Sequence, residues 1–184
     1  GYKNTNFKKS KGSRNHLFSS LIANLSSDDK VMSNLEIKIQ KVSNPTYLKV
    51  HDIDTLLVDK DKNILENTLS YNFSNNDYSL GLNFSAYEDL EKIGNKRYEY
   101  LLPSLNFEKN LLTDENLGTF DLNTIVDVRN FEANKQTEFL VNDILWESKK
   151  WKNNFGFKNN LKGLFKIVNY NSEKAKGLKN DQNN

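Results

Sequence analysis

Few residues of this 184-residue sequence have types and spacing that suggest chemistry. The most compact group is His51, Asp52 and Asp54, which combines an imidazole with two carboxylates, as acid–base or metal chemistry would require. The group lies in a polar stretch, however, where a solvated loop explains it without any catalytic role. The carboxylates of Asp28 and Asp29 lie in a turn-forming stretch and have the same ordinary explanation. We therefore expect no catalytic residues and no enzymatic activity.

Metal and cofactor sites are not expected either. The sequence has no cysteine and two histidines, which excludes thiolate metal sites and argues against a histidine-rich site. It contains no nucleophile elbow, no phosphate-binding glycine loop and no zinc spacing. The formal charge of +2 and the mean hydropathy of −0.74 argue against strong capture of nucleic acid and against a helical membrane protein. Function must therefore be sought in the architecture.

The clearest element is a β-hairpin from Ile64 to Tyr87. Apolar and polar side chains alternate along both arms, and this period of two is typical of strands with one apolar face. The arms meet at Asn75-Asn76-Asp77, residue types that tolerate the left-handed backbone angles of tight turns. The expected apolar face consists of Leu65, Leu69, Tyr71 and Phe73 on the first arm, and Tyr78, Leu80, Leu82, Phe84 and Ala86 on the second.

Similar alternation predicts more strands on both sides of this hairpin. Two long polar connections, Thr46–Asn63 and Glu88–Arg97, separate the hairpin from its neighbours, and everything after Asn171 is expected to be loop. The predicted strands are His16–Leu25, Leu35–Gln40, Tyr98–Lys109, Phe120–Phe131, Thr137–Glu147 and Phe155–Ile167.

The facing stays open for His16–Leu25 and for Thr137–Glu147, and Tyr98–Lys109 contains a proline. In Tyr98–Lys109, simple alternation places Leu101, Pro103, Leu105 and Phe107 on one face and Tyr100, Leu102, Ser104 and Asn106 on the other. Pro103 suggests an irregularity or an unpaired edge position. In Thr137–Glu147 apolar side chains fall on both faces, which suggests a bulge.

The prediction is an all-β fold: an antiparallel up-and-down meander of about eight long strands. Strands of about ten to thirteen residues exceed the usual five or six of soluble sheets. Eleven residues at about 3.3 Å each, tilted by about 40°, cover about 28 Å, the height of an outer-membrane hydrocarbon band. The cleaner apolar faces carry no charged residue between their ends, which lipid contact explains because a mid-bilayer Lys or Arg costs about 2 to 4 kcal/mol. The core of a soluble sandwich explains it equally well.

Two sets of side chains would mark a membrane barrel. Aromatic residues mostly toward strand ends could form an interfacial girdle, although ordinary packing explains them too. Polar residues on the opposite faces could line a wet lumen or simply meet solvent. The girdle candidates are Tyr71, Tyr78, Tyr98, Tyr100, Trp146 and Trp151, and the lumen-facing candidates are Glu36, Lys38, Gln40, Asp121, Asn123, Arg129, Lys158 and Lys162.

The expected domain organisation is simple. Residues 1–14 form a polar loop or the start of a fragment, residues 15–171 a partial barrel domain, and residues 172–184 a polar tail or loop. The sequence starts at Gly1 rather than at a methionine, so we expect an internal piece of a longer protein.

Three segments resemble the lipopolysaccharide-assembly outer-membrane protein family, LptD, in its alphaproteobacterial form. They are Ile39–Lys49 (IQKVSNPTYLK), Leu101–Phe107 (LLPSLNF) and Gly163–Tyr170 (GLFKIVNY). Each motif is weak alone, but their order and spacing match over most of the region from His16 to Tyr170. The sequence departs at single positions, with Asn44, Lys49 and Asn169 where the family often has Asp, Arg and Asp.

The resemblance implies an internal segment of a very large outer-membrane barrel that inserts lipopolysaccharide into the outer leaflet. The implied partners are lipopolysaccharide, outer-membrane lipid, a plug lipoprotein (LptE-like) and the periplasmic bridge components of the transport machine; no cofactor and no nucleic acid are implied. Thr46–Asn63 and Glu88–Lys96 would be outward loops, and Asn75-Asn76-Asp77 a periplasmic turn. The polar face, with residues such as Lys38 and Arg129, would line the lumen and meet the plug. The alternative is a soluble β-sandwich or repeat-type binding module, which the low hydropathy supports.

Overall fold

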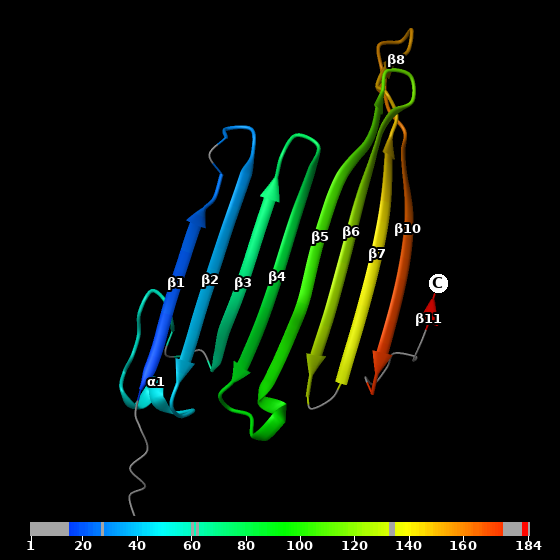
Figure 1. Ribbon diagram of the computed structural model, residues 1–184. Coiled ribbons are helices and arrows are strands. Elements are labelled where there is room, and N and C mark those ends of the chain that lie inside the picture. The colour runs from blue at the N-terminus through cyan, green and yellow to red at the C-terminus, as the bar shows by residue number, and fades with distance from the viewer. Residues whose placement is uncertain are drawn as a thin grey trace, which may run out of the picture.

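The computed structural model describes residues 15–26, 28–59, 61, 63–132, 135–174 and, for the backbone, 182–183. The predicted polar start, residues 1–14, lies outside the described residues. Within them the chain is all-β, which confirms the predicted class, and the strands follow one another across one antiparallel sheet as a meander (Figure 1). The strands are β1 His16–Asn24, β2 Met32–Val42, β3 Ile64–Ser74, β4 Tyr78–Asp89, β5 Tyr98–Asp114, β6 Gly118–Phe131, β7 Lys135–Glu147, β8 Trp151–Lys152, β9 Lys158–Asn159, β10 Lys162–Glu173 and β11 Gln182–Asn183.

The predicted hairpin is the β3–β4 pair. Its arms pair without interruption from Ile64 opposite Asp89 to Ser74 opposite Ser79. At the turn, the Asn75 side-chain oxygen accepts the backbone N–H groups of Asp77 and Tyr78, each at 2.9 Å. Asparagine closes such turns because its short side chain satisfies nearby backbone donors. The turn chemistry and the alternation therefore specify the same register.

β5 corrects the predicted facing of its first half. Its pairing with β4 shifts between Asn83, opposite Ser104, and Ser85, opposite Leu101, so one extra residue of β5 is accommodated near Pro103. A bulge of this kind reverses the alternation beyond it. The irregularity predicted at Pro103 is confirmed, but the predicted faces are wrong: Tyr100 lies with Leu105 and Phe107, while Leu101 joins the opposite face.

β7 pairs regularly with both neighbours, from Thr119 opposite Glu147 to Phe131 opposite Lys135 on the β6 side. The bulge predicted within Thr137–Glu147 is therefore wrong. The predicted last strand also starts later than expected, because β10 begins at Lys162 and the preceding residues form the separate β8–β9 pair. β11 pairs with Asn169 and Tyr170 of β10, in a region predicted to be loop.

The two long connections contain short helices that the sequence did not predict, α1 at Tyr47–Val50 and η1 at Gly94–Arg97. The α1 connection folds back on the sheet and forms a small core at that end of the molecule. Leu48 is 2% exposed and Leu65 is completely buried. This core is composed of Val42, Tyr47, Leu48, Val58, Leu65 and Leu90, with Phe18 and Ile53 packed against it.

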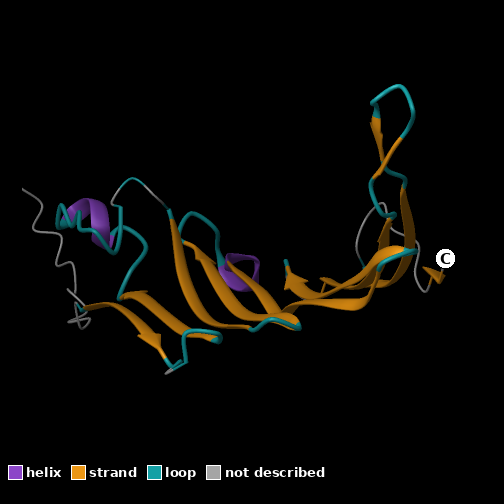
Figure 2. Ribbon diagram, turned by 90° about the horizontal axis from the view of Figure 1, so that it is seen from above, coloured by secondary structure: helices purple, strands orange, loops and turns teal. Residues whose placement is uncertain are grey.

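Away from this core the sheet is a single curved layer (Figure 2). The strand order places β1 at one edge and the short β11 at the other. Among the described residues the only other sheet is the β8–β9 pair, whose strands have two residues each. Side chains on both faces of the long strands are therefore accessible over most of their length.

Two glycines, Gly118 in the β5–β6 turn and Gly94 in η1, allow a comparison that tests the packing of this turn. Gly118 has φ +92°, and a β-carbon there would overlap the Glu147 carbonyl oxygen and lie 2.7 Å from Ser148 Cα, whereas a β-carbon at Gly94, φ +65°, meets nothing within 4 Å. We expect Gly118→Ala to lower the free energy of unfolding well beyond the roughly 1 to 2 kcal/mol of backbone strain that Gly94→Ala introduces. Denaturant midpoints of the two variants measure the difference, and equal midpoints would contradict this packing of the turn.

Candidate functional site

The strand register sorts the side chains into two faces, because directly opposed residues of antiparallel strands project on the same side. On one face, Leu35 of β2 lies opposite Tyr71 of β3, and the same row of side chains continues with Leu82 of β4 and Leu105 of β5. It reaches Val126 of β6, which lies opposite Leu140 of β7. We call this the apolar face; it includes Ile37, Leu69, Phe73, Leu80, Phe84, Phe107, Leu122, Ile144, Phe165 and Ile167. The other face, here the polar face, includes Asn34, Glu36, Ser70, Asn72, Asn83, Asn106, Glu108, Asp121, Asn123 and Asp127.

The apolar face is uncovered. Leu69 is 42% exposed and Phe165 is 61% exposed, although both are large hydrophobic residues in the middle of strands. A face of exposed hydrophobic residues that continues across the strands of a sheet is unusual, because soluble monomers rarely expose contiguous apolar patches beyond a few hundred Å². The structure therefore presents a broad apolar surface in need of an apolar environment.

Charged residues on the apolar face stand at its borders. On β4 the side chains of the apolar face are uncharged from Tyr78 up to Glu88. At about 3.3 Å per residue and a tilt of about 40°, this stretch spans about 25 Å. Lys109 lies opposite Tyr78 at one border, and Glu138 stands near the start of β7 at the other. The remaining charged members, Lys41, Glu88, Asp114 and Glu173, lie within two residues of their strand ends.

Five of the six girdle candidates lie on the apolar face. Tyr78 and Trp146 mark one border, where Trp146 stacks on Phe120 with ring centroids 6.2 Å apart. Tyr98 and Tyr100 stack at 6.3 Å at the opposite border, and the β5 bulge puts them on this face. Tyr71 lies deeper, three residues before the end of β3.

The sixth girdle candidate is placed differently from the prediction. Trp151 lies in β8, outside the main sheet, and so does the lumen candidate Lys158, in β9. Neither can belong to a face of that sheet. The other seven lumen candidates, Glu36, Lys38, Gln40, Asp121, Asn123, Arg129 and Lys162, share the polar face.

The polar face holds its cations in ion pairs between neighbouring strands. Lys38 Nζ lies 2.7 Å from Glu66, and Arg129 lies 2.7 Å from Glu99. On the β7–β10 pair, Lys162 lies 3.0 Å from Glu147 and Lys166 lies 3.1 Å from Asp143. Exposed pairs of this kind each contribute about 0 to 1 kcal/mol, so they favour a hydrated surface more than they stabilise the sheet.

Other groups on the polar face also call for polar surroundings. Asn123 and Asp143 face each other across β6 and β7, and each has an enclosed side-chain oxygen with no hydrogen-bond donor among the described residues. Enclosed acceptors of this kind are normally satisfied by a donor such as water. Apolar residues also occur on the polar face, among them Ile22, Leu101 and Phe139, and the Phe139 ring stacks on Tyr170 with ring centroids 6.0 Å apart.

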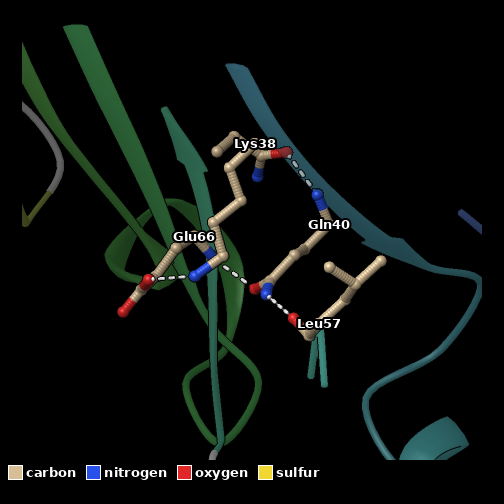
Figure 3. A network of polar contacts seen from close by, with 5 residues as sticks. Lys38, Gln40, Leu57 and Glu66 are labelled. Carbon is tan, nitrogen blue, oxygen red and sulfur yellow. Dashed lines mark hydrogen bonds and ion pairs between the residues drawn. The ribbon is translucent and has the colours of Figure 1, made fainter. Parts of the chain in front are cut away.

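The most organised polar cluster joins β2 and β3 where their backbone ladder ends, after Lys38 opposite Thr68 (Figure 3). Beyond that point the side chain of Gln40 replaces the ladder. Its Oε1 accepts the Glu66 N–H at 2.8 Å, its Nε2 donates to the Leu57 carbonyl at 2.5 Å, and its own N–H donates to Asn67 Oδ1 at 2.9 Å. Gln40 is 5% exposed. One side chain therefore holds β2, β3 and the α1 connection together on the polar side.

In the His51, Asp52 and Asp54 group, His51 takes part in the packing of α1. The His51 ring packs on Tyr47, with centroids 4.5 Å apart, and the Tyr47 hydroxyl lies 3.1 Å from His16 Nδ1. Both histidines thus serve the packing of α1. Among the described residues no three His, Cys, Asp or Glu side chains are arranged to hold a metal ion.

The turn that follows β6 carries a local charge pair. Lys135 donates a hydrogen bond to Glu132, and this bond together with the lysine charge lowers the pKa of the Glu132 carboxyl. The end of the sheet opposite the β5–β6 turn therefore carries a charged carboxylate.

Comparison with known proteins identifies no relative: no family model, no curated protein and no solved structure matches the chain. Among the described residues, no helix is long and apolar enough to cross a bilayer. The function must therefore be inferred from the physical arrangement of the two faces.

Two features escaped the sequence reasoning. The bridging role of Gln40 leaves no signal in the alternation, because Gln40 simply occupies a polar position of β2. The β8–β9 hairpin did leave one: Asn153 and Gly156 are turn-forming residues, the first just before and the second within the predicted strand Phe155–Ile167.

Removal of the Gln40 side chain tests the β2–β3 junction. Gln40→Ala leaves the Glu66 N–H and the Leu57 carbonyl without these partners, and we expect a loss of about 1 to 3 kcal/mol. Lys38→Gln, on the same strand and face, removes only an exposed ion pair and should cost at most about 1 kcal/mol. Amide hydrogen exchange at Glu66 should accelerate in the first variant alone; unchanged protection there would contradict the bridging role.

Proposed function

We propose that this chain is a membrane-spanning segment of an outer-membrane β-barrel, and that the barrel inserts lipopolysaccharide into the outer leaflet. The observation that carries the first part is the uncovered apolar face, whose charged residues stand at its two borders. Exposing each large apolar side chain forfeits roughly 1.5 to 3 kcal/mol of burial. A lipid bilayer supplies the missing apolar environment along the whole face at once.

The dimensions and borders of the apolar face support lipid over a second protein layer. Its uncharged span of about 25 Å equals the apolar band of outer-membrane barrels. Tyr78 and Trp146 at one border and Tyr98 and Tyr100 at the other have the place and chemistry of interfacial girdles. A sandwich core imposes no such band and no such borders.

In this proposal the sheet is part of a larger closed barrel. The layer is curved, and α1 lies on the inner side of the curve (Figure 2); Gln40 of the polar face donates a hydrogen bond to Leu57 in the α1 connection. Further strands paired with β1 and β10 would close the sheet and remove its edges, which natural β proteins avoid exposing. The ion-paired polar face would then enclose a hydrated interior that can accommodate a plug lipoprotein.

The cargo rests on the sequence resemblance. Its three segments lie at the end of β2 with the turn into α1, across the bulge of β5, and within β10. In the proposal, the connections at the α1 and η1 end face outward and the Asn75-Asn76-Asp77 turn faces the periplasm. Energy for transport, supplied through periplasmic bridge components, would come from elsewhere in the machine.

A neighbouring pair of substitutions in the full-length parent protein tests the proposal. Leu82→Arg places a charge in the middle of the apolar face, where we expect about 2 to 4 kcal/mol of destabilisation, loss of heat-modifiable gel migration and loss of lipopolysaccharide at the cell surface. Asn83→Arg, on the polar face, should leave all three nearly unchanged. The parent should also fractionate with outer membranes.

Two results would count against the proposal. Recovery of the parent protein in the soluble fraction would favour the soluble binding module. The second result separates the barrel from its cargo. If the parent is an outer-membrane barrel that tolerates Asn83→Arg and not Leu82→Arg, but lipopolysaccharide export stays normal after its depletion, the barrel assignment holds and the cargo assignment is wrong.

A further inference from the structure

The β8–β9 hairpin, residues 148–161, is the part of the chain that neither face of the sheet explains. It extends beyond the ends of β7 and β10 (Figure 1) and turns away from the layer of the sheet (Figure 2). Its large hydrophobic residues are exposed: Phe155 is 86%, Phe157 66% and Trp151 42% exposed.

The hairpin is held in shape by its own polar groups. The Asn153 side-chain oxygen accepts the N–H groups of Phe155, at 3.1 Å, and Phe157, at 2.9 Å, while Gly156 takes a positive φ of 85°. At its base, Ser148 and Leu161 exchange two hydrogen bonds of 2.8 Å. The exposed aromatic residues are thus displayed on a defined scaffold.

The two faces of the hairpin differ in chemistry. Trp151 pairs with Asn159, and Asn153 pairs with Phe157 through the bond from the Asn153 N–H to the Phe157 carbonyl at 3.0 Å. Alternation therefore places Trp151 and Phe157 on one face. Lys152 and Lys158, which oppose each other, lie on the other face.

The hairpin is also strongly basic. Lys149, Lys150, Lys152 and Lys158 are all exposed, and residues 148–161 contain no Asp or Glu. Since the whole chain carries a formal charge of +2, the rest of it has two more acidic than basic side chains. The hairpin is thus one of two basic stretches of the sequence; the other, residues 1–14, has five basic and no acidic side chains.

We infer that the β8–β9 hairpin binds an anionic phospholipid surface. The lysines would contact the phosphate headgroups, while Trp151, Phe155 and Phe157 enter the boundary between headgroups and acyl chains. Amphipathic elements that combine Lys with Trp, Phe and Leu associate with anionic membranes in this way.

Lipid is favoured over other anionic partners because exposed apolar residues continue from the hairpin into the sheet. Leu161 is 57% exposed just before β10, and Ile167, on the apolar face of β10, is 38% exposed. Single-stranded nucleic acid would use aromatic rings as stacking platforms along a basic groove. Aliphatic side chains of this kind add nothing to stacking but partition into an acyl phase.

The test compares binding of the full chain to two kinds of vesicle. Vesicles of phosphatidylcholine alone report contacts that need no lipid charge, and vesicles with added phosphatidylglycerol report the hairpin. We expect affinity to rise at least about tenfold on the anionic vesicles, and this increment to vanish at 1 M salt, where the Debye length is about 3 Å. Lys149, Lys150, Lys152 and Lys158, all changed to Gln, should abolish the increment without lowering the binding to phosphatidylcholine.

A second variant serves as the matched control. Lys30, Lys41, Lys49 and Lys96 are exposed and lie elsewhere in the chain, so their change to Gln removes the same charge. This control should retain the increment; its loss in both variants would overturn the inference, because total charge rather than the hairpin would then be responsible. Competition by inorganic phosphate or by a single-stranded oligonucleotide at equal ionic strength would overturn it as well.

The depth of insertion supplies an independent readout. In a Trp146→Phe background Trp151 is the one remaining tryptophan, and lipid-borne quenchers should quench its emission on anionic vesicles. Phe155→Ser with Phe157→Ser should reduce this quenching, and unquenched Trp151 in the bound protein would refute insertion. Failure of the barrel proposal would give a different result: the protein would not bind vesicles of phosphatidylcholine alone, where the hairpin makes no contribution.

Discussion

The alternation of side chains along paired strands is the constraint on which this structure depends. Because the backbone ladder is continuous from β2 to β10 apart from local shifts, every row of side chains is fixed to one face across the sheet. A single layer with no partner sheet among the described residues then has to satisfy two environments at once. The apolar face requires an apolar phase, and the ion-paired polar face requires water.

The irregular positions preserve this separation. The bulge of β5 moves Tyr98 and Tyr100 to the apolar face, where they meet the border formed by β4. Gln40 takes over where the β2–β3 ladder ends and ties the α1 connection to the polar side. Both local departures from regular pairing keep polar groups satisfied while the long strands maintain the two faces.

Much of this fold could be predicted from the sequence, for a physical reason. β3, β4 and β6 carry apolar residues on one face and polar residues on the other, so the pattern alone specifies their extent and facing. β7 is apolar on both faces, with Phe139 and Val141 on the polar side, and only its pairing with β6 and β10 determines how it is oriented. In β5 the extra residue near Pro103 reverses the pattern, which no local alternation rule anticipates.

The same distinction applies to the functional surfaces. The alternation groups most girdle and lumen candidates on one face or the other of the sheet, whereas Trp151 and Lys158 lie in the β8–β9 pair outside it. The turn chemistry of Asn153 and Gly156 overrides that alternation.

The central claim is that the apolar face touches acyl chains while the polar face touches water. The sequence has no cysteine, so single cysteines can be introduced in turn at Leu69, Ser70, Tyr71 and Asn72 of the membrane-embedded parent protein and labelled with a fluorophore. The account predicts strong quenching by lipid-borne quenchers at positions 69 and 71, and quenching by a water-soluble quencher at positions 70 and 72. Equal exposure of all four positions to the water-soluble quencher, or shielding of positions 69 and 71 from both quenchers by protein, would contradict it.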